Sequence, residues 1–301
     1  MVLFIMIASK QSHDQLAVLS LLFSAAMWGL IWYPLRELNA QGMSGLWTTL
    51  VMYSAAITLT IPLLWQRIRG VQWHLLVGLA ISAGVTNIAF VIAMIEGEVM
   101  RVMLLFYLSP FWTVLIGRWW LKERLSSRAV LWFLSAMIGA LIMLWNPTIA
   151  WPWPQDYADF LAMIAGLAFA IHNVLARKLA KTDMVVKTAA TWWGVVLMSG
   201  VLLLLSATTV PTVTWDIWLA AWLLGWFGIV LMTVAVLYGL ARMPVYRSAV
   251  IMLSELIVAA ISAWWLTEET MTMYEWVGGM VILVSAYGVA RLSVNEKQKE
   301  I

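Results

Sequence analysis

Apolar stretches separated by short polar joints recur along the chain from residue 16 to residue 292. Each stretch is close to the roughly 20 residues that a helix needs to cross about 30 Å of hydrocarbon. Backbone groups in lipid must be hydrogen-bonded internally, which at this length favours helices over barrel strands. Thr272, three positions before Glu275, predicts a capping box at the start of the last helix. The pattern predicts ten membrane-spanning helices: Leu16–Leu35, Trp47–Trp65, Trp73–Ile95, Val99–Arg118, Ala129–Asn146, Tyr157–Arg177, Val185–Ser206, Ile217–Ala241, Ser248–Leu266 and Tyr274–Leu292.

The composition supports a membrane protein. The 301 residues are 63% hydrophobic and 11% charged, whereas a soluble domain is roughly 45–50% apolar and about 25% charged. This balance excludes a soluble enzyme and a disordered chain. The absence of cysteine excludes thiol catalysis, thiolate metal sites and disulfides. No basic region precedes the opening apolar residues, so we expect the first span to insert without cleavage.

The basic residues predict the topology. Sixteen of the 18 Lys and Arg residues fall in joints on one predicted face, together with both termini, and the exceptions are Arg36 and Arg101. Short cytoplasmic joints carry an excess of basic residues, so we expect both termini in the cytoplasm. The net charge of +3 is scattered between apolar runs and therefore does not indicate a nucleic-acid partner. We expect a multi-pass protein of a bacterial inner membrane that is a monomer or a weak homodimer.

A motif near the end of the fourth span is repeated near the end of the ninth. Shifting the sequence by 145 residues aligns Leu108–Glu123 with Leu253–Glu268, and seven of the 16 positions are identical, including a Trp-Trp-Leu-x-Glu run. Five spans in each half is an odd number, so the second half has to be inverted relative to the first. Inverted repeats are typical of secondary transporters, because related halves can exchange conformations to give alternating access. The alternative is an ancient duplication with no present mechanistic role.

Glu255 is the strongest candidate for a site residue. At 1.5 Å per residue it lies about 13 Å into the ninth span, close to the middle of the membrane. A carboxylate at that depth is costly and usually faces a cavity or a partner. It could carry a coupling proton or meet a cationic group on a substrate; the alternative is a structural hydrogen bond to a neighbouring helix. Pro110 occupies the equivalent position in the first half. It frees a carbonyl near Phe106, which could line a cavity or only allow a bend.

Three polar residues deep in other spans are further candidates. His172 could form a proton relay with Glu255, and a lone buried histidine bonded to a backbone carbonyl is the alternative. Asn173 follows it directly, and Asn87 lies deep in the third span. Small residues at every fourth position predict the closely packed face of the sixth helix: Ala162, Gly166 and Ala170.

Arg101 and three aromatic residues complete the candidate set. Arg101 departs from the positive-inside pattern, so it could bind a substrate carboxylate at the outer mouth or form a gate salt bridge; the alternative is a local pair with Glu98. Trp28, Trp32 and Tyr107 are candidate walls for an amphipathic substrate. Anchoring at the membrane interface is the default explanation for the many tryptophans near span ends.

These motifs resemble those of the drug/metabolite transporter superfamily, in particular its EamA-type permeases. The resemblance covers nearly the whole chain. Its most specific parts are Glu98–Pro110 (EVMRVMLLFYLSP), which runs into Trp119–Leu125 (WWLKERL), and the echo at Leu253–Glu268. The sequence departs from the family pattern at Glu255, where proline is common, and at Glu269, where arginine is common. The resemblance implies a secondary transporter of small metabolites, typically an exporter of amino acids or related compounds, with a central cavity between two five-helix halves.

The expected fold is therefore an all-α membrane protein of ten helices in two inverted five-helix repeats. We expect the first repeat over residues 1–147, the second over 155–294 and a cytoplasmic tail over 295–301. The expected function is export of a small zwitterionic or amphipathic metabolite, with a proton as candidate coupling ion and no cofactor. One alternative is an intramembrane enzyme acting on a lipid or hydrophobic substrate, but the sequence has no paired catalytic constellation or phosphate-binding loop. A channel is another alternative, but no ring of like charges is evident.

Overall fold

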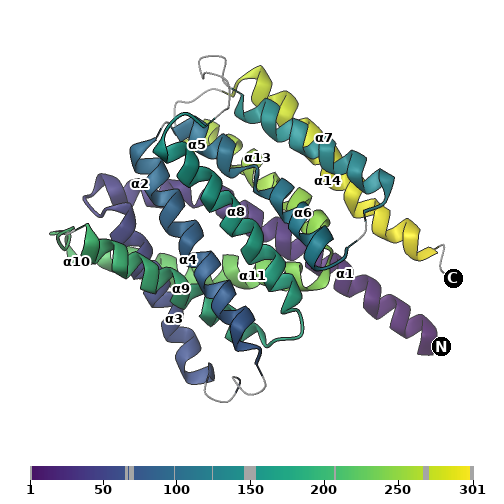
Figure 1. Cartoon of the computed structure of the whole chain (residues 1–301), viewed down its shortest axis with the longest axis horizontal. Coiled ribbons are helices and arrows are strands. Elements are labelled where there is room, and N and C mark those ends of the chain that lie inside the picture. The colour runs from purple at the N-terminus through teal and green to yellow at the C-terminus, as the bar shows by residue number, and fades with distance from the viewer. Residues whose placement is uncertain are drawn as a thin grey trace.

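In the computed structural model the chain is a bundle of packed helices (Figure 1). The structure describes residues 2–64, 67, 71–97, 99–123, 125–145, 154–206, 208–266 and 271–298, and these ranges contain no strand. Glu98, Glu268 and Glu269, the predicted domain end at residue 147 and the last three residues of the predicted tail lie outside them. The expected all-helical fold is confirmed.

The first half of the chain forms seven helical segments. They are α1 (Val2–Leu30), α2 (Trp32–Ala40), α3 (Gly45–Leu64), α4 (Trp73–Glu96), α5 (Val99–Phe106), α6 (Ser109–Trp120) and α7 (Ser127–Leu144). The second half forms eight segments. They are α8 (Tyr157–Lys178), α9 (Met184–Leu205), α10 (Trp215–Leu223), the π-helical segment η1 (Leu224–Ile229), α11 (Val230–Arg242), α12 (Val245–Met252), α13 (Ser254–Leu266) and α14 (Met273–Gln298).

Several of these segments join end to end into membrane spans. Within the described ranges, α14 contributes a shorter apolar stretch, Met273–Val289, and nine segments are long and apolar enough to cross a membrane. The nine are Gln15–Ala40, Gly45–Leu64, Trp73–Met94, Arg101–Trp120, Ser127–Leu144, Tyr157–Lys178, Met184–Leu205, Trp215–Arg242 and Val245–Leu266. Together they correspond in order to the ten predicted spans.

Local sequence signals explain several boundaries. The capping box is confirmed, because Thr272 N–H donates to Glu275 (2.7 Å) and Glu275 N–H donates to the Thr272 hydroxyl (3.3 Å). The first span continues to Ala40, beyond its predicted end, and is interrupted at Ile31. Pro34 explains the interruption, since proline has no N–H to donate to the carbonyl four residues earlier.

The first helix of each half packs mainly against the other half. α8 packs on α4, α5 and α6, while α1 packs on α11, α12 and α13. We call α4, α5, α6 and α8 the first packing unit, and α11, α12, α13 and α1 the second packing unit. Each contact in one unit has a counterpart in the other, as expected for halves related by an approximate two-fold axis. A buried hydrogen bond from the Ser24 hydroxyl to the Met232 carbonyl (3.0 Å) joins α1 to α11.

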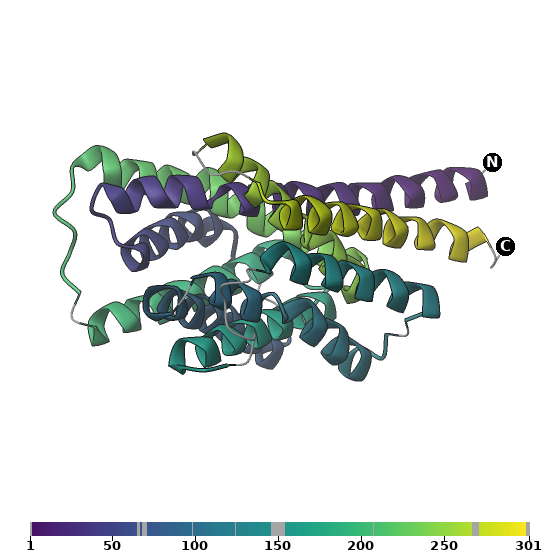
Figure 2. The ribbon, with the colours of Figure 1, turned by 90° about the horizontal axis from the view of Figure 1, so that it is seen from above.

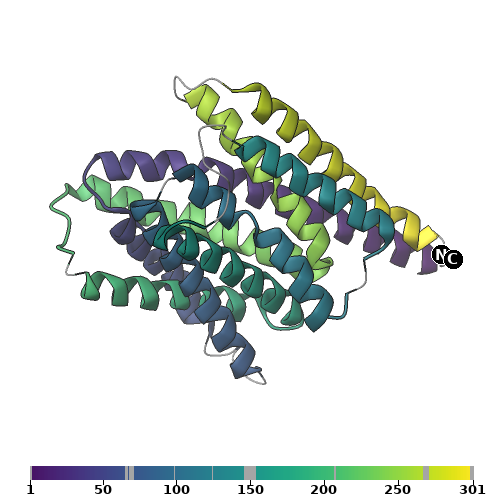
Figure 3. The same cartoon turned by 45° about the horizontal axis from the view of Figure 1, so that its top comes forward.

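The remaining long helices form pairs that join the two halves. α7 and α14 lie side by side along one edge of the bundle (Figures 1 and 3), and α3 packs on α9. Gly139 and Gly278 allow the first pair to approach closely, because a Cβ on either glycine would lie within 3 Å of the partner's backbone oxygen. Both termini lie at the same end of the bundle (Figures 2 and 3). We call this the termini end and the opposite one the far end.

Candidate functional site

A narrow cavity lies between the two packing units. One helix pair from each unit encloses it: the α5–α6 span and α8 from the first unit, and α11 and the α12–α13 span from the second. Its lining consists of Phe106, Tyr107, Ser109, Pro110, Thr113, Phe169, Asn173, Val236, Leu240, Ser248, Ala249, Met252, Leu253 and Glu255. The cavity thus lies between the two packing units, beside the middle of the fourth and ninth spans.

Two interrupted helices meet at this cavity. The fourth span breaks between α5 and α6 at Tyr107 and Leu108, and the ninth span breaks between α12 and α13 at Leu253. The repeat alignment pairs Leu108 with Leu253 and Pro110 with Glu255. Both halves therefore interrupt the same span at the same place. Irregular backbone inside a membrane is tolerated where it is packed in protein or lines a cavity.

Each interruption is contacted by a glycine from the other half's first helix. A Cβ on Gly166 of α8 would lie 2.8 Å from the Phe106 carbonyl oxygen, and a Cβ on Gly29 of α1 would lie 2.6 Å from the Glu255 carbonyl oxygen. The Phe106 carbonyl is the one that Pro110 cannot bond, as predicted. Only glycine allows a helix to approach another backbone this closely. The closely packed face predicted for the sixth span, which is α8, is confirmed, with Ala162 and Ala170 fully buried.

A hydrogen bond links the two interruptions. The Tyr107 hydroxyl donates to Oε1 of Glu255 at 2.5 Å. Glu255 is the eleventh residue of the 22-residue span Val245–Leu266, so its carboxylate lies near the middle of the membrane. It also lies in the first turn of α13, where the partial positive charge of a helix N-terminus stabilises a carboxylate.

Aromatic rings form one wall of the cavity. The Phe106 ring lies at the centre of a cluster, with centroids 4.8 Å from Phe90, 5.7 Å from Tyr107 and 5.6 Å from Phe169. The cavity volume is about 30 Å³, which leaves room for water but not for a metabolite. A larger ligand can therefore enter only if the packing units move apart.

The termini end of the cavity is closed by a polar network that joins the packing units. Glu123, just beyond α6, accepts a hydrogen bond from Arg177 Nε at 3.2 Å and one from the Val245 N–H at 2.9 Å. Arg177, at the end of α8, also donates to the Ala241 carbonyl at 2.7 Å. Glu123 and Arg177 belong to the first unit, whereas Ala241 and Val245 belong to the second.

A second ion pair lies at the far end and stays within the first unit. Arg101 of α5 donates to Oδ2 of Asp159, in the first turn of α8, at 3.2 Å. Asp159 also accepts a hydrogen bond from the Gln155 N–H at 2.9 Å. The side chains are only 10% and 1% exposed, so the charges depend on each other for stabilisation. Ion pairs thus fix the α5–α6 span to α8 at both ends.

A larger groove of about 620 Å³ lies between the α1–α2 span and the α10–α11 span. Its lining is mainly apolar, with Glu37 as its acidic side chain, and contains none of the predicted site residues. The central cavity combines a deep carboxylate with the repeat's interrupted helices, so it is the better candidate site.

The structure brings four of the predicted residues together and leaves others apart. Glu255, Pro110, Tyr107 and Asn173 line the central cavity. His172 lies outside its lining, and its Nδ1 is 3.3 Å from the Leu79 carbonyl oxygen, which matches the alternative of a buried histidine bonded to backbone.

Other predicted residues have different surroundings. Asn87 is half-buried on α4, outside the cavity lining. Trp28 packs against the apolar cluster around Met52 and Trp192. Trp32 donates from Nε1 to the Ser262 hydroxyl at 3.0 Å and so joins α2 to α13. The structure pairs Arg101 with Asp159 on another helix, a partner that the sequence pattern does not indicate.

Several cavity and network residues are not identifiable from the sequence. Phe106 and Phe169 are unremarkable among many apolar residues, and their proximity depends on α8 packing against the first half. Glu123 and Arg177 lie in basic joints that serve as topology signals. Asp159 carries the one usable signal: it is an acidic residue just inside a predicted span, where charge is costly.

Comparisons with known proteins agree with the repeat and the fold. A model of the EamA-like transporter family matches residues 15–145 and again residues 156–291. One solved crystal structure matches 92% of this chain and 96% of its own, with a TM-score of 0.77 and 17% identity, and this likeness shows the fold alone. No curated protein matches the sequence. Because the family model covers most of the chain in two copies, the chain belongs to the EamA-like transporter family of multi-pass membrane proteins.

Proposed function

We propose that the protein is a secondary exporter of small amphipathic metabolites, such as amino acids or related compounds, that works by alternating access. The observation that carries this proposal is the central cavity, which is bounded by a helix pair from each packing unit and contains the deep carboxylate of Glu255. Its position at interrupted helices of inverted repeats is typical of substrate sites in secondary transporters.

The packing units are the elements that we propose move relative to each other. Opening the cavity toward the termini end requires two hydrogen bonds to break, from the Val245 N–H to Glu123 and from Arg177 to the Ala241 carbonyl, together with the packing of α6 on α12 and of α8 on α11. The Glu123–Arg177 and Arg101–Asp159 pairs lie within the first unit and can persist. Opening toward the far end can leave the network at the termini end intact. The Tyr107–Glu255 hydrogen bond crosses between the units at the cavity itself.

Glu255 is the proposed carrier of the coupling proton. A membrane-embedded carboxylate that can reach a cavity is a common element of proton relays. Among the described residues, Tyr107 is the titratable side chain that contacts Glu255. From α1, Gly29 packs against the Glu255 backbone and brings no charge. Release of the proton would leave Oε1 held by the tyrosine hydroxyl, so the ionised carboxylate would keep a hydrogen bond.

The proposed orientation places the termini end in the cytoplasm of a bacterial cell, because 16 of the 18 basic residues fall on that predicted face. One chain contains every residue of the cavity lining, so we propose that a monomer is sufficient for function. The proposed repeats are residues 1–147 and 155–294, followed by a tail from 295 to 301.

Transport by purified protein in liposomes tests the function. We expect export in sensitive cells to protect growth against a toxic amino-acid analogue, and the same compound to cross liposomes only when the protein is present. The matched variants are Glu255→Gln, in the cavity, and Glu37→Gln, on the exposed face of α2. The proposal would be refuted if the protein protected growth against none of a broad panel of toxic metabolites and carried no flux in liposomes.

A reporter fused after Ile301 tests the orientation. Activity of a reporter that works only in the cytoplasm is expected. Activity of a periplasmic reporter at this position would contradict the proposed topology.

A further inference from the structure

The charge of the central cavity points to its substrate class. Among the fourteen lining residues, all within the described ranges, Glu255 is the one acidic residue and none is Lys, Arg or His. The other polar groups are hydroxyls and the Asn173 amide, which can bond either sign of charge but neutralise neither. A charged ligand therefore meets a single negative counter-charge.

The geometry around Glu255 leaves room for a second partner of its carboxylate. Tyr107 bonds Oε1, whereas no described residue bonds Oε2. A carboxylate has about four acceptor sites, so Oε2 is open to a cationic group beside the tyrosine hydroxyl. An ionised carboxylate within a membrane is stabilised most by an opposite charge.

The aromatic wall suits the same ligand. Phe106, Tyr107 and Phe169 line the cavity beside Glu255, with the Phe106 centroid less than 6 Å from those of the other two rings. Aromatic faces attract cations within about 6 Å of the ring centroid and also pack against a flat apolar body. The wall and the carboxylate thus favour an organic cation with an aromatic part.

None of the fourteen lining residues can neutralise a substrate carboxylate. The basic residues at the two ends of the α5–α6 and α8 pair are already paired, Arg101 with Asp159 and Arg177 with Glu123. A zwitterion or an anion would have to bury a carboxylate without a cationic partner from the lining, which is strongly unfavourable in a protein interior.

We propose that the transported substrates are monovalent organic cations with an aromatic or apolar body, held by the Glu255 carboxylate against the aromatic wall. This inference rests on the proposed transport function and restricts its amphipathic substrates to cations, so it replaces the zwitterionic amino acids named there. The same carboxylate would hold either the substrate cation or the coupling proton, so occupation by one would exclude the other.

A matched set of three probes tests this proposal: benzyltrimethylammonium, a permanent cation; L-phenylalanine, a zwitterion; and 3-phenylpropionate, an anion. Binding is measured on the detergent-purified full chain as a ligand-dependent rise in the melting temperature, and transport as flux into liposomes. We expect benzyltrimethylammonium to stabilise the protein and to move at least tenfold faster than the other two. Glu255→Gln keeps the size of the side chain. In this variant we expect both the cation-dependent rise in the melting temperature and the cation flux to fall at least tenfold.

Glu255→Asp and Glu37→Gln are the companion variants. Glu255→Asp retains the carboxylate and should still prefer the cation, whereas Glu37→Gln removes an exposed charge and should behave as wild type. These variants separate loss of charge from loss of folding, which a melting curve without ligand also reports.

The outcomes distinguish the two proposals. Transport of phenylalanine or phenylpropionate in preference to the cation overturns the cation proposal and leaves the transport proposal intact. Binding of the cation without flux supports the cation site and overturns transport. Failure of the cation both to bind and to move overturns the cation proposal, even if another probe is transported.

Discussion

The two interrupted spans differ in one informative residue. The fourth span carries Pro110 at its interruption and the ninth carries Glu255 at the equivalent position, yet both helices break there. Proline therefore cannot be the general cause of the break. Both breaks carry a Leu-Ser pair, and a glycine of the other half's first helix packs against a carbonyl close to each break, before it in the fourth span and after it in the ninth. The repeated packing fixes the interruption, which leaves the next position available for chemistry in the second half.

The largest effect is expected for Glu255→Pro, which makes the two interruptions alike. Proline is tolerated in the first turn of a helix, and Glu255 lies in the first turn of α13, so we expect a folded protein. Transport should fall by about a hundredfold, because the variant loses both the deep carboxylate and the acceptor for Tyr107. This fall corresponds to a rise of about 3 kcal/mol in the activation free energy of transport. Flux in liposomes and a melting curve measure the two effects. Wild-type flux in this variant would show that Glu255 has no part in the mechanism.

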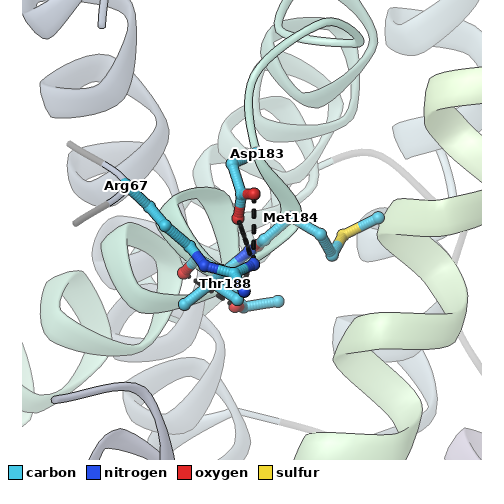
Figure 4. A network of polar contacts seen from close by, with 5 residues as sticks. Arg67, Asp183, Met184 and Thr188 are labelled. Carbon is cyan, nitrogen blue, oxygen red and sulfur yellow. Dashed lines mark hydrogen bonds and ion pairs between the residues drawn. The ribbon is translucent and has the colours of Figure 1, made fainter. Parts of the chain in front are cut away.

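Arg101→Gln should destabilise the first interrupted span. It removes the partner of the buried Asp159, and breaking a buried ion pair costs about 3–5 kcal/mol. The control is Arg67→Gln. Arg67 pairs with Asp183 at 3.2 Å with both side chains substantially exposed, at 46% and 38% (Figure 4). Exposed pairs contribute about 0–1 kcal/mol. Equal shifts in the denaturation midpoint for the two variants would contradict this difference in burial.

Gly29→Ala and Gly166→Ala test whether packing fixes the interruptions. Each added Cβ would lie under 3 Å from a backbone oxygen, so the helices must separate. We expect this separation to lower the free energy of unfolding by about 1–3 kcal/mol. Gly29→Ala should have the larger effect, because Val258 and Ala259 also lie within 3.0 Å of its added Cβ. Gly200→Ala is the matched control, since nothing lies within 4 Å of its added Cβ. Thermal melting of all three variants in the same detergent distinguishes them; a control as unstable as the other two would refute the packing argument.

Pro110→Ala should have the smallest effect. The second half forms the same interruption without proline, so the break should persist, with a stability change under about 1 kcal/mol and transport within about threefold of wild type. A large loss of transport would show that the first half depends on its proline and would end the comparison between the halves.

The helices and their repeat could be predicted from the sequence, because length and hydropathy alone determine spans in a membrane. The free carbonyl at Phe106 could also be predicted, from the N–H that Pro110 lacks. The deep position of Glu255 follows from counting residues along a straight helix. These features are local, so they need no knowledge of which helices touch.

The partners of these residues could not be predicted, because they depend on packing between halves. Tyr107 meets Glu255 only through the approach of the fourth and ninth spans, and Arg101 meets Asp159 only because α8 packs on the first half. The π-helical segment η1 is another example. It brings Gly225 against the Met52 carbonyl, and the Trp226 Nε1 donates to the Ala55 carbonyl at 2.9 Å, whereas the sequence there reads as an ordinary apolar helix.

The exchange of first helices between the halves has a consequence for biosynthesis. The hydrogen bond from Ser24 to Met232 joins residues 208 positions apart. At a synthesis rate of about 5–20 residues per second, α1 waits about 10–40 s in the membrane for its permanent neighbours. During that time the face of α1 that later contacts α11 has none of its final partners, so α1 must be stable in the membrane without them. Assembly of the second packing unit therefore begins only once the eighth span has been inserted, and a ribosome that stops after the first repeat leaves a product in which neither packing unit can be completed.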